Sequence, residues 1–301
     1  MEYIIQTKNL DFKYSKNNKI LKNLSIHVPK GSIYGFLGPN GAGKSTTMRL
    51  LTGIIPDSSN SILLFDKPIK SQIPAVFKKV GALVESPALY LHLSGYDNLK
   101  YIALLRKVPL SRIDEVLSLV ELTHAKKQKA KQYSLGMKQR LAIAMALLSE
   151  PELLFLDEPV NGLDPNGIVE IRKLLVKLNK EKGITIFVSS HLLSEIEKMC
   201  THIGIISKGV LKYEGTMEDL SKKFDTCKIQ ITLDDAETWK EKLNLTHENV
   251  VIEESNKISL SLSSTLEIPN FTKKIIQDGA QIYELKILEG LEEWFMNLTE
   301  N

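Results

Sequence analysis

The sequence is poor in several features, and each shortage excludes a class of protein. Its two cysteines, Cys200 and Cys227, lie far apart and match no metal-binding or redox spacing, so reduced thiols in a cytosol are expected. The first residues contain no basic segment followed by an apolar one, so no signal peptide is expected. The longest apolar run, residues 141–148, is much shorter than the ~18 residues that cross a bilayer. The net charge of +3 is too small to indicate nucleic acid or an anionic membrane as a partner.

The rest of the composition is that of an ordinary globular protein, and its apolar pattern alternates between strands and helices. Apolar strands that alternate with helices are typical of an α/β fold with a mixed, largely parallel sheet. A block of helical periodicity interrupts the alternation and predicts a helical subdomain at about residues 86–148. We expect strands at residues 4–12, 24–28, 32–38, 61–65, 152–159 and 184–190, and helices at 44–52, 96–106, 111–122, 134–148, 165–183 and 192–200. Together they predict one domain over residues 1–220.

The last part of the chain, residues 226–301, has a different pattern. Strands are expected at residues 228–233, 250–254, 257–262 and 281–288, and helices at 235–243, 267–279 and 291–298. The first six of these elements follow the order β-α-β-β-α-β, which is the signature of a split βαβ unit. We therefore predict a separate C-terminal α+β, ferredoxin-like extension, with two helices on one face of a four-stranded antiparallel sheet.

A phosphate-binding loop is the strongest motif in the sequence. The segment "GPNGAGKST" matches G-x-x-x-x-G-K-[ST] at every fixed position, after a predicted strand and before a predicted helix. Backbone N–H groups of such a loop and the helix N-terminus bind a polyphosphate, so ATP is the expected ligand. Lys44 should reach the β- and γ-phosphates, and Ser45 should ligate Mg²⁺. The predicted nucleotide-binding residues here are Gly38, Pro39, Asn40, Gly41, Ala42, Gly43, Lys44, Ser45 and Thr46.

Two consecutive carboxylates follow the apolar strand in "LLFLDEP". Asp157 ends that strand, where it is expected to act on Mg²⁺ beside the phosphate loop. Glu158 is the predicted general base, because a carboxylate there can orient the attacking water and accept its proton.

With these motifs, residues 1 to about 220 resemble the ATP-binding subunits of ABC transporters. The resemblance implies that Tyr14 stacks on adenine and that His191 contacts the γ-phosphate and senses hydrolysis. "YSLGM" stands where the family has Leu-Ser-Gly-Gly-Gln, and it keeps Ser134 and Gly136 for contact with ATP bound to a second subunit. Asp164, in "NGLD", is implied in the loop that couples the two sites.

One position departs from the family in charge. Where the family carries a glutamine that helps to hold Mg²⁺ and the attacking water, this sequence has Glu85. A carboxylate is a stronger ligand for a hard cation, but it also repels the γ-phosphate. We therefore predict that Glu85 acts on Mg²⁺ and catalysis. The alternative is an ordinary contact with a membrane subunit.

The resemblance also implies a function. It indicates a homodimer of ATPase subunits that binds integral membrane permease subunits and lies peripherally on the cytoplasmic face of the membrane, without inserting into it. The altered signature, the segment "LDEPVNGLDPNGI" and the C-terminal extension resemble the bacterial exporters that handle antibiotics and bacteriocins. Glu85 resembles, more narrowly, the ATPases of lantibiotic self-immunity exporters, with bacitracin-resistance exporters second. Two other classes are alternatives: a soluble ABC ATPase of DNA repair or the ribosome, and a nucleotide-dependent regulator that moves no substrate.

Overall fold

The chain forms two compact units, Met1–Met217 and Glu218–Glu300. The computed structural model describes residues 2–15, 18–57, 59–85, 87–223, 227–247, 250–254, 256–263, 265–287 and 291–299. Residues 86, 226 and 301, which bound the predicted domains, and residue 288, which ends a predicted strand, lie outside these ranges.

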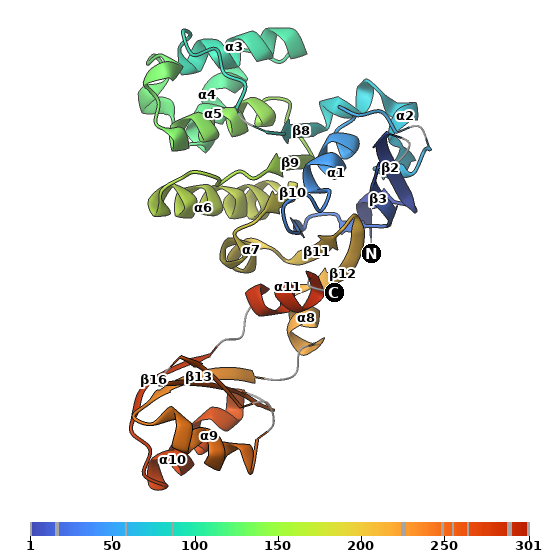
Figure 1. The fold of residues 1–301 in the computed structure, drawn as a ribbon. Coiled ribbons are helices and arrows are strands. Elements are labelled where there is room, and N and C mark those ends of the chain that lie inside the picture. Colours follow the sequence, from blue (N-terminus) through green and yellow to red (C-terminus); the bar gives the residue numbers. More distant parts are fainter. Residues whose placement is uncertain are drawn as a thin grey trace. The chain divides into compact units, whose positions relative to one another are not determined.

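The first unit is built on a six-stranded sheet in the order β12-β11-β5-β10-β9-β8 (Figure 1). The neighbours from β11 to β8 are parallel, and β12 is antiparallel to β11. Strands β5, β9 and β10 are buried along their whole length, as expected of apolar strands covered on both faces. The bounds are β5 Ile33–Leu37, β8 Val80–Leu83, β9 Leu153–Asp157, β10 Thr185–Ser190, β11 His202–Ser207 and β12 Val210–Thr216. The predicted α/β class with a mixed sheet is confirmed.

The N-terminal strands form a second sheet, in the order β4-β1-β6-β7, and a separate pair, β2 and β3. The predicted strand over residues 4–12 is in fact two strands, because the chain turns at Asn9, whose φ is +50°. The sequence analysis also missed β3, β7, β8, β11 and β12. Strand β3 reads NKILKNL, and its buried residues, Leu21 and Leu24, are three positions apart, so it lacks the alternation typical of a strand. The bounds are β1 Tyr3–Thr7, β2 Leu10–Ser15, β3 Asn18–Leu24, β4 His27–Pro29, β6 Ile62–Leu64 and β7 Lys67–Pro68.

Helices α3, α4 and α5 pack together as a lobe of the first unit, beyond the edge strand β8 (Figure 1). The residue immediately before a helix often carries a side chain that accepts a hydrogen bond from a backbone N–H of the first helical turn. Ser94 does so for α3, Ser134 for α5 and Asp164 for α6. The helices of the unit are α1 Lys44–Leu51, α2 Ile69–Gln72, α3 Gly95–Arg106, α4 Ser111–Leu119, α5 Leu135–Leu147, α6 Pro165–Lys182 and α7 Leu193–Met199, with 3₁₀ turns at Ala75–Lys78, Thr123–Ala125 and Ala130–Gln132.

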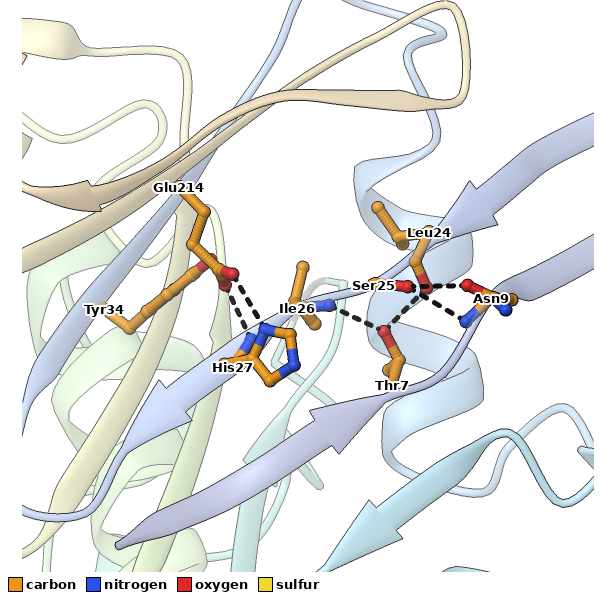
Figure 2. A network of polar contacts seen from close by, with 8 residues as sticks. All are labelled: Thr7, Asn9, Leu24, Ser25, Ile26, His27, Tyr34 and Glu214. Carbon is orange, nitrogen blue, oxygen red and sulfur yellow. Dashed lines mark hydrogen bonds and ion pairs between the residues drawn. The ribbon is translucent and has the colours of Figure 1, made fainter. Parts of the chain in front are cut away.

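A polar network ties the last strand of this unit to its beginning (Figure 2). The Glu214 carboxylate, on β12, accepts hydrogen bonds from the buried Tyr34 hydroxyl at 2.8 Å and from the His27 backbone N–H at 2.6 Å. The His27 ring Nδ1 lies 3.1 Å from the other oxygen of Glu214. Burial, and then the neighbouring Glu214 charge, raise the pKa of Tyr34 well above its usual value, so the phenol stays protonated and donates.

The second unit is an α+β structure around a four-stranded sheet in the order β14-β15-β13-β16, with every neighbouring pair antiparallel. Apolar side chains of α9 and α10 share one buried cluster with one face of this sheet, including Trp239 and Phe271. Both helices therefore cover the same face, as the ferredoxin-like prediction requires. The bounds are α8 Met217–Lys223, β13 Cys227–Leu233, α9 Ala236–Asn244, β14 Val251–Glu254, β15 Lys257–Leu262, α10 Ile268–Gln277, β16 Ile282–Ile287 and α11 Leu291–Thr299, with a 3₁₀ turn at Thr265–Glu267.

Candidate functional site

The phosphate loop joins β5 to α1 at the carboxyl edge of the parallel sheet, where ligands of α/β proteins bind. Two of its glycines are required by local geometry. A Cβ at Gly38 would clash with the carbonyl oxygen of Ile206, and Gly43 has a φ of +112°. Because α1 begins at Lys44, the unpaired N–H groups of its first turn face the space above the loop.

Lys44 is the best-defined cation of the site. Its side chain is buried, and its Nζ donates to the carbonyl oxygens of Gly38 at 2.7 Å and Pro39 at 3.3 Å. Burial lowers the pKa of Lys44, while the charges of Glu158 and Asp157 oppose that shift. The Lys44 side chain is thus folded back onto the first residues of the loop. Two carboxylates lie close enough to stabilise its charge.

An open cavity of about 530 Å³ lies above the loop. It brings together the phosphate loop, the corner after β9 and the turn after β10, although these segments are far apart in the sequence. Its lining residues are Ile20, Asn40, Gly41, Gly43, Lys44, Ser45, Thr46, Glu158, Asn161 and His191. Of the loop residues outside this lining, Gly38 and Ala42 are buried and Pro39 is exposed.

Asp157 and Glu158 end β9 in two different environments. Asp157 is buried, and its carboxylate accepts a hydrogen bond from the Ser189 hydroxyl of the neighbouring strand β10. Glu158 has a left-handed backbone, with φ of +50°, and its N–H group donates to the Ser189 hydroxyl oxygen at 3.1 Å. The change of backbone direction turns the Glu158 side chain to the cavity, while Asp157 stays at the sheet edge.

Glu158 and His191 form the polar pair at the mouth of the cavity. Nδ1 of His191 lies 2.7 Å from Oε2 of Glu158, and the His191 backbone N–H donates to the same oxygen at 3.3 Å. The Glu158 carboxylate is largely shielded, with 23% of its side chain exposed, whereas the histidine is 47% exposed. A shielded carboxylate oriented by an imidazole is suited to bind a water molecule and accept its proton.

The donor set beside the loop also suits Mg²⁺. Ser45 offers an exposed hydroxyl at the start of α1, and Asp157 offers a carboxylate at the sheet edge. In the described part of the chain, no three or more His, Cys, Asp or Glu side chains converge as a metal cage. Oxygen donors in small number fit Mg²⁺, which keeps several waters and takes further ligands from substrate phosphates.

Comparison with known proteins assigns these features to one family. The family model for ABC transporters matches residues 21–161. An uncharacterised ABC transporter ATP-binding protein of Bacillus subtilis, YhcH, is 38% identical over 99% of this chain and 97% of its own length. This chain belongs to the ABC transporter ATP-binding proteins. It is an ATPase subunit, and its hydrolysis of ATP is coupled to transport.

Two further relatives of this ABC subunit are named for the compounds they transport. The bacitracin transport ATP-binding protein BcrA of Enterococcus faecalis is 46% identical over 74% of this chain and 72% of its own length. The lantibiotic transport ATP-binding protein SrtF of Streptococcus pyogenes is 42% identical over 74% of this chain and 96% of its own length.

Solved structures agree with the family. The ABC subunit CbiO1 of Clostridium perfringens is 32% identical, covers 75% of this chain and 95% of its own, and superposes with a TM-score of 0.67. A dimeric ATP-binding cassette bound to ADP and Pi, MJ0796, is 25% identical, covers 71% and 98%, and has a TM-score of 0.63. None of the helices in the described residues of the subunit has the length and apolarity of a membrane span.

In the ABC subunit, Glu85 lies two residues after β8 and is not part of the cavity lining. Its Oε1 accepts a hydrogen bond from Nε of Arg49 at 3.0 Å and also contacts Nη2 of that arginine. Nη1 of Arg49 donates to the Tyr14 hydroxyl at 3.4 Å. Hydrogen bonds from Thr46, and then from Arg49, lower the pKa of the exposed Tyr14 phenol. The structure thus brings Tyr14 and Glu85 to one arginine, while the role predicted for each remains a prediction.

Three other predicted residues of the ABC subunit lie on exposed helix starts, away from the cavity lining. Ser134 caps α5 through the Met137 N–H at 3.2 Å, and Gly136 lies in the first turn of that helix. Asp164 caps α6 through the Gly167 N–H at 3.0 Å. Each cap gives its residue a structural role within the chain, and the predicted contacts with a second subunit remain predictions.

The sequence analysis missed four residues of this site, namely Ile20, Arg49, Asn161 and Ser189. Ile20 and Asn161 line the cavity, and Ser189 holds Asp157 and the Glu158 backbone. A signal for Arg49 existed, because it stands four residues after Ser45 and so on the same face of α1.

Proposed function

We propose that this chain is the ATP-hydrolysing subunit of an exporter that expels a peptide antibiotic through separate membrane subunits. The observation that carries the ATPase mechanism is the Glu158 carboxylate at the cavity mouth, oriented by His191 and close enough to stabilise the Lys44 charge. An intact base of this kind argues against a regulator that binds nucleotide without turnover. The names and identities of BcrA and SrtF support the substrate class.

Bacitracin and a lantibiotic are the two candidate substrates, and two observations favour the bacitracin class. The identity to BcrA is 46%, against 42% for SrtF. In both alignments 74% of this chain is matched, but this covers 96% of SrtF and only 72% of BcrA. Like this chain, BcrA therefore has a part outside the aligned region. A lantibiotic is the second candidate, because Glu85 resembles those self-immunity ATPases.

In the proposed mechanism each residue acts on bound ATP at one edge of the sheet. Lys44 binds the β- and γ-phosphates. Ser45 and Asp157 would hold Mg²⁺, which when bound would supply positive charge beside the phosphates. Glu158 orients a water molecule and accepts its proton as the water attacks the γ-phosphate. His191 fixes the Glu158 side chain and contacts the γ-phosphate. The loop glycines turn backbone N–H groups toward the phosphates, and Tyr14 stacks on adenine.

We further propose that two copies enclose two ATP molecules. Ser134 is exposed and Gly136 is partly exposed at the N-terminus of α5, where N–H groups and the helix dipole favour a phosphate of the opposite subunit. Asp164, on the neighbouring helix start, couples the two sites. The dimeric cassette MJ0796 with ADP and Pi supports this arrangement. The dimer would bind permease subunits at the cytoplasmic face of the membrane, with residues 1–220 as the ATPase domain and 226–301 as an accessory domain.

The test is drug sensitivity in the source organism. Deletion of the gene should lower the inhibitory concentration of bacitracin more than that of a lantibiotic such as nisin. A plasmid with the wild-type gene should restore resistance, and one with Glu158→Gln should not. Unchanged resistance to both compounds after deletion would refute the substrate class, and a larger loss for nisin would select the lantibiotic alternative.

A further inference from the structure

The ion pair of Glu85 with Arg49 has a definite place relative to the phosphate loop. Arg49 is in the last turn of α1, and its Nε and Nη2 both contact Oε1 of Glu85. Its third nitrogen, Nη1, donates to the Tyr14 hydroxyl. The guanidinium is thereby fixed on two sides, and its planar shape allows the fork that a lysine could not make.

The register of α1 brings this pair close to the proposed metal ligand. Ser45 and Arg49 are four residues apart on one helix, so their side chains lie on the same face, roughly 5–6 Å apart at Cβ. Glu85 is therefore paired with a residue that lies one helical turn from Ser45. The pair thus connects Glu85 to the face of α1 that carries Ser45.

The charges at this place explain how the chain tolerates a glutamate there. A carboxylate near the γ-phosphate repels it. The permanent positive charge of Arg49, which is paired with Glu85, offsets part of this repulsion. The same positive charge weakens the attraction of Glu85 for Mg²⁺. Arg49 and Mg²⁺ would thus compete for the same carboxylate.

We propose that Arg49 is a positioning residue, which holds the Glu85 carboxylate against α1 and sets the Mg²⁺ concentration at which the metal recruits it. The proposal rests on the proposed function, because it takes Ser45 and Asp157 as the Mg²⁺ ligands. It adds a residue that the nucleotide-binding motifs do not contain. It also assigns Glu85 a role that depends on a partner in α1.

The chain offers a matched control at the other end of the same two strands. Lys79 directly precedes β8 and Glu152 directly precedes β9, and their side chains form an ion pair of 2.8 Å. Both side chains are exposed, as Glu85 is, but they lie at the edge opposite to the phosphate loop. Loss of this pair removes the same kind of interaction without a change near the metal.

The experiment compares wild type, Arg49→Met, Glu85→Gln and the double variant, with Lys79→Met and Glu152→Gln as controls. Mg²⁺ titrations of ATPase activity at fixed ATP should give Arg49→Met a half-saturating Mg²⁺ concentration roughly two- to fivefold lower than wild type, the range expected for an exposed ion pair. In the Glu85→Gln background, Arg49→Met should cause no shift. The controls should match wild type, and Arg49→Lys, which keeps the charge, should lie between wild type and Arg49→Met.

A second readout needs neither Mg²⁺ nor turnover. Thermal unfolding in EDTA should show that the effects of Arg49→Met and Glu85→Gln are not additive, because each removes the same ion pair. Superimposed Mg²⁺ curves for wild type and Arg49→Met, or a shift that persists in the Glu85→Gln background, would overturn the proposal. If Arg49→Met does not fold, Arg49→Gln takes its place in every comparison. Failure of the proposed function would appear separately, as normal turnover in Glu158→Gln.

Discussion

The corners of the chain at Glu158 and Glu85 share a backbone conformation but differ in their surroundings. Strands β8 and β9 are parallel neighbours, and each is followed at its carboxyl end by a glutamate with a left-handed backbone, with φ of +69° at Glu85 and +50° at Glu158. Each glutamate pairs with one basic side chain, Arg49 or His191. The Glu158 side chain is 23% exposed and lines the cavity, whereas Glu85 is 57% exposed and outside its lining.

The partner explains the difference. Arginine keeps its proton at any physiological pH, so Glu85 faces a permanent positive charge. An imidazole can form a hydrogen bond without a permanent charge, so it can orient a carboxylate without neutralising it. On the proposed mechanism, the same backbone corner provides a base at Glu158 and an adjustable metal contact at Glu85. This difference gives an ordered series of tests.

The largest effect is expected at the first corner, in Glu158→Gln. The amide keeps the shape and still binds the water molecule, but it cannot accept the proton. Turnover should fall by about 10²–10⁴-fold, the usual contribution of a general base, with ATP binding retained. Single-turnover hydrolysis and a filter-binding measurement of ATP check this. Wild-type turnover would remove Glu158 from the mechanism.

Lys44→Ala should fail at an earlier step than either corner, because a buried cation that faces the phosphates is lost. A hydrogen bond to a charged group contributes about 1.5–3 kcal/mol, so ATP affinity should fall by roughly 10–150-fold. Calorimetric titration with ATP measures it. The conservative Lys44→Arg serves as the control for charge, and unchanged affinity in Lys44→Ala would contradict the assignment.

His191→Ala isolates the partner of the first corner. We expect ATP binding to persist and turnover to fall on the order of 10²-fold, as when one oriented donor is removed from a reacting site. A loss larger than that of Glu158→Gln would reverse the order of the two residues. In Glu158→Gln, which has already lost the base, His191→Ala should have little further effect.

The smallest effect is expected at the second corner, in Glu85→Gln. The protein should keep its fold and measurable ATPase activity, with a changed Mg²⁺ requirement and altered coupling to transport. Mg²⁺ titration of activity and a drug-resistance assay measure the two properties. If both are indistinguishable from wild type, the charge has no role, and the two corners share only their backbone geometry.

The sequence predicts what is local and leaves out what the tertiary structure adds. The phosphate loop, Asp157 and Glu158 could be found because each motif is contiguous and follows a strand. The ion pair of Arg49 with Glu85 could not, since it joins residues that are 36 positions apart, one on α1 and the other after β8. Strands β11 and β12 were missed although β11 is buried, and the cap made by Asp164 became visible only with the start of α6.

The network at Glu214 has a consequence for how such a subunit can be cut or recombined. The carboxylate near the end of β12 is the acceptor of the buried Tyr34 hydroxyl, which stands 180 residues earlier (Figure 2). A fusion junction placed before Glu214 would strand that hydroxyl at a cost of about 1–3 kcal/mol and release the start of β4 as well. An exchangeable ATPase module must therefore extend at least through Glu214.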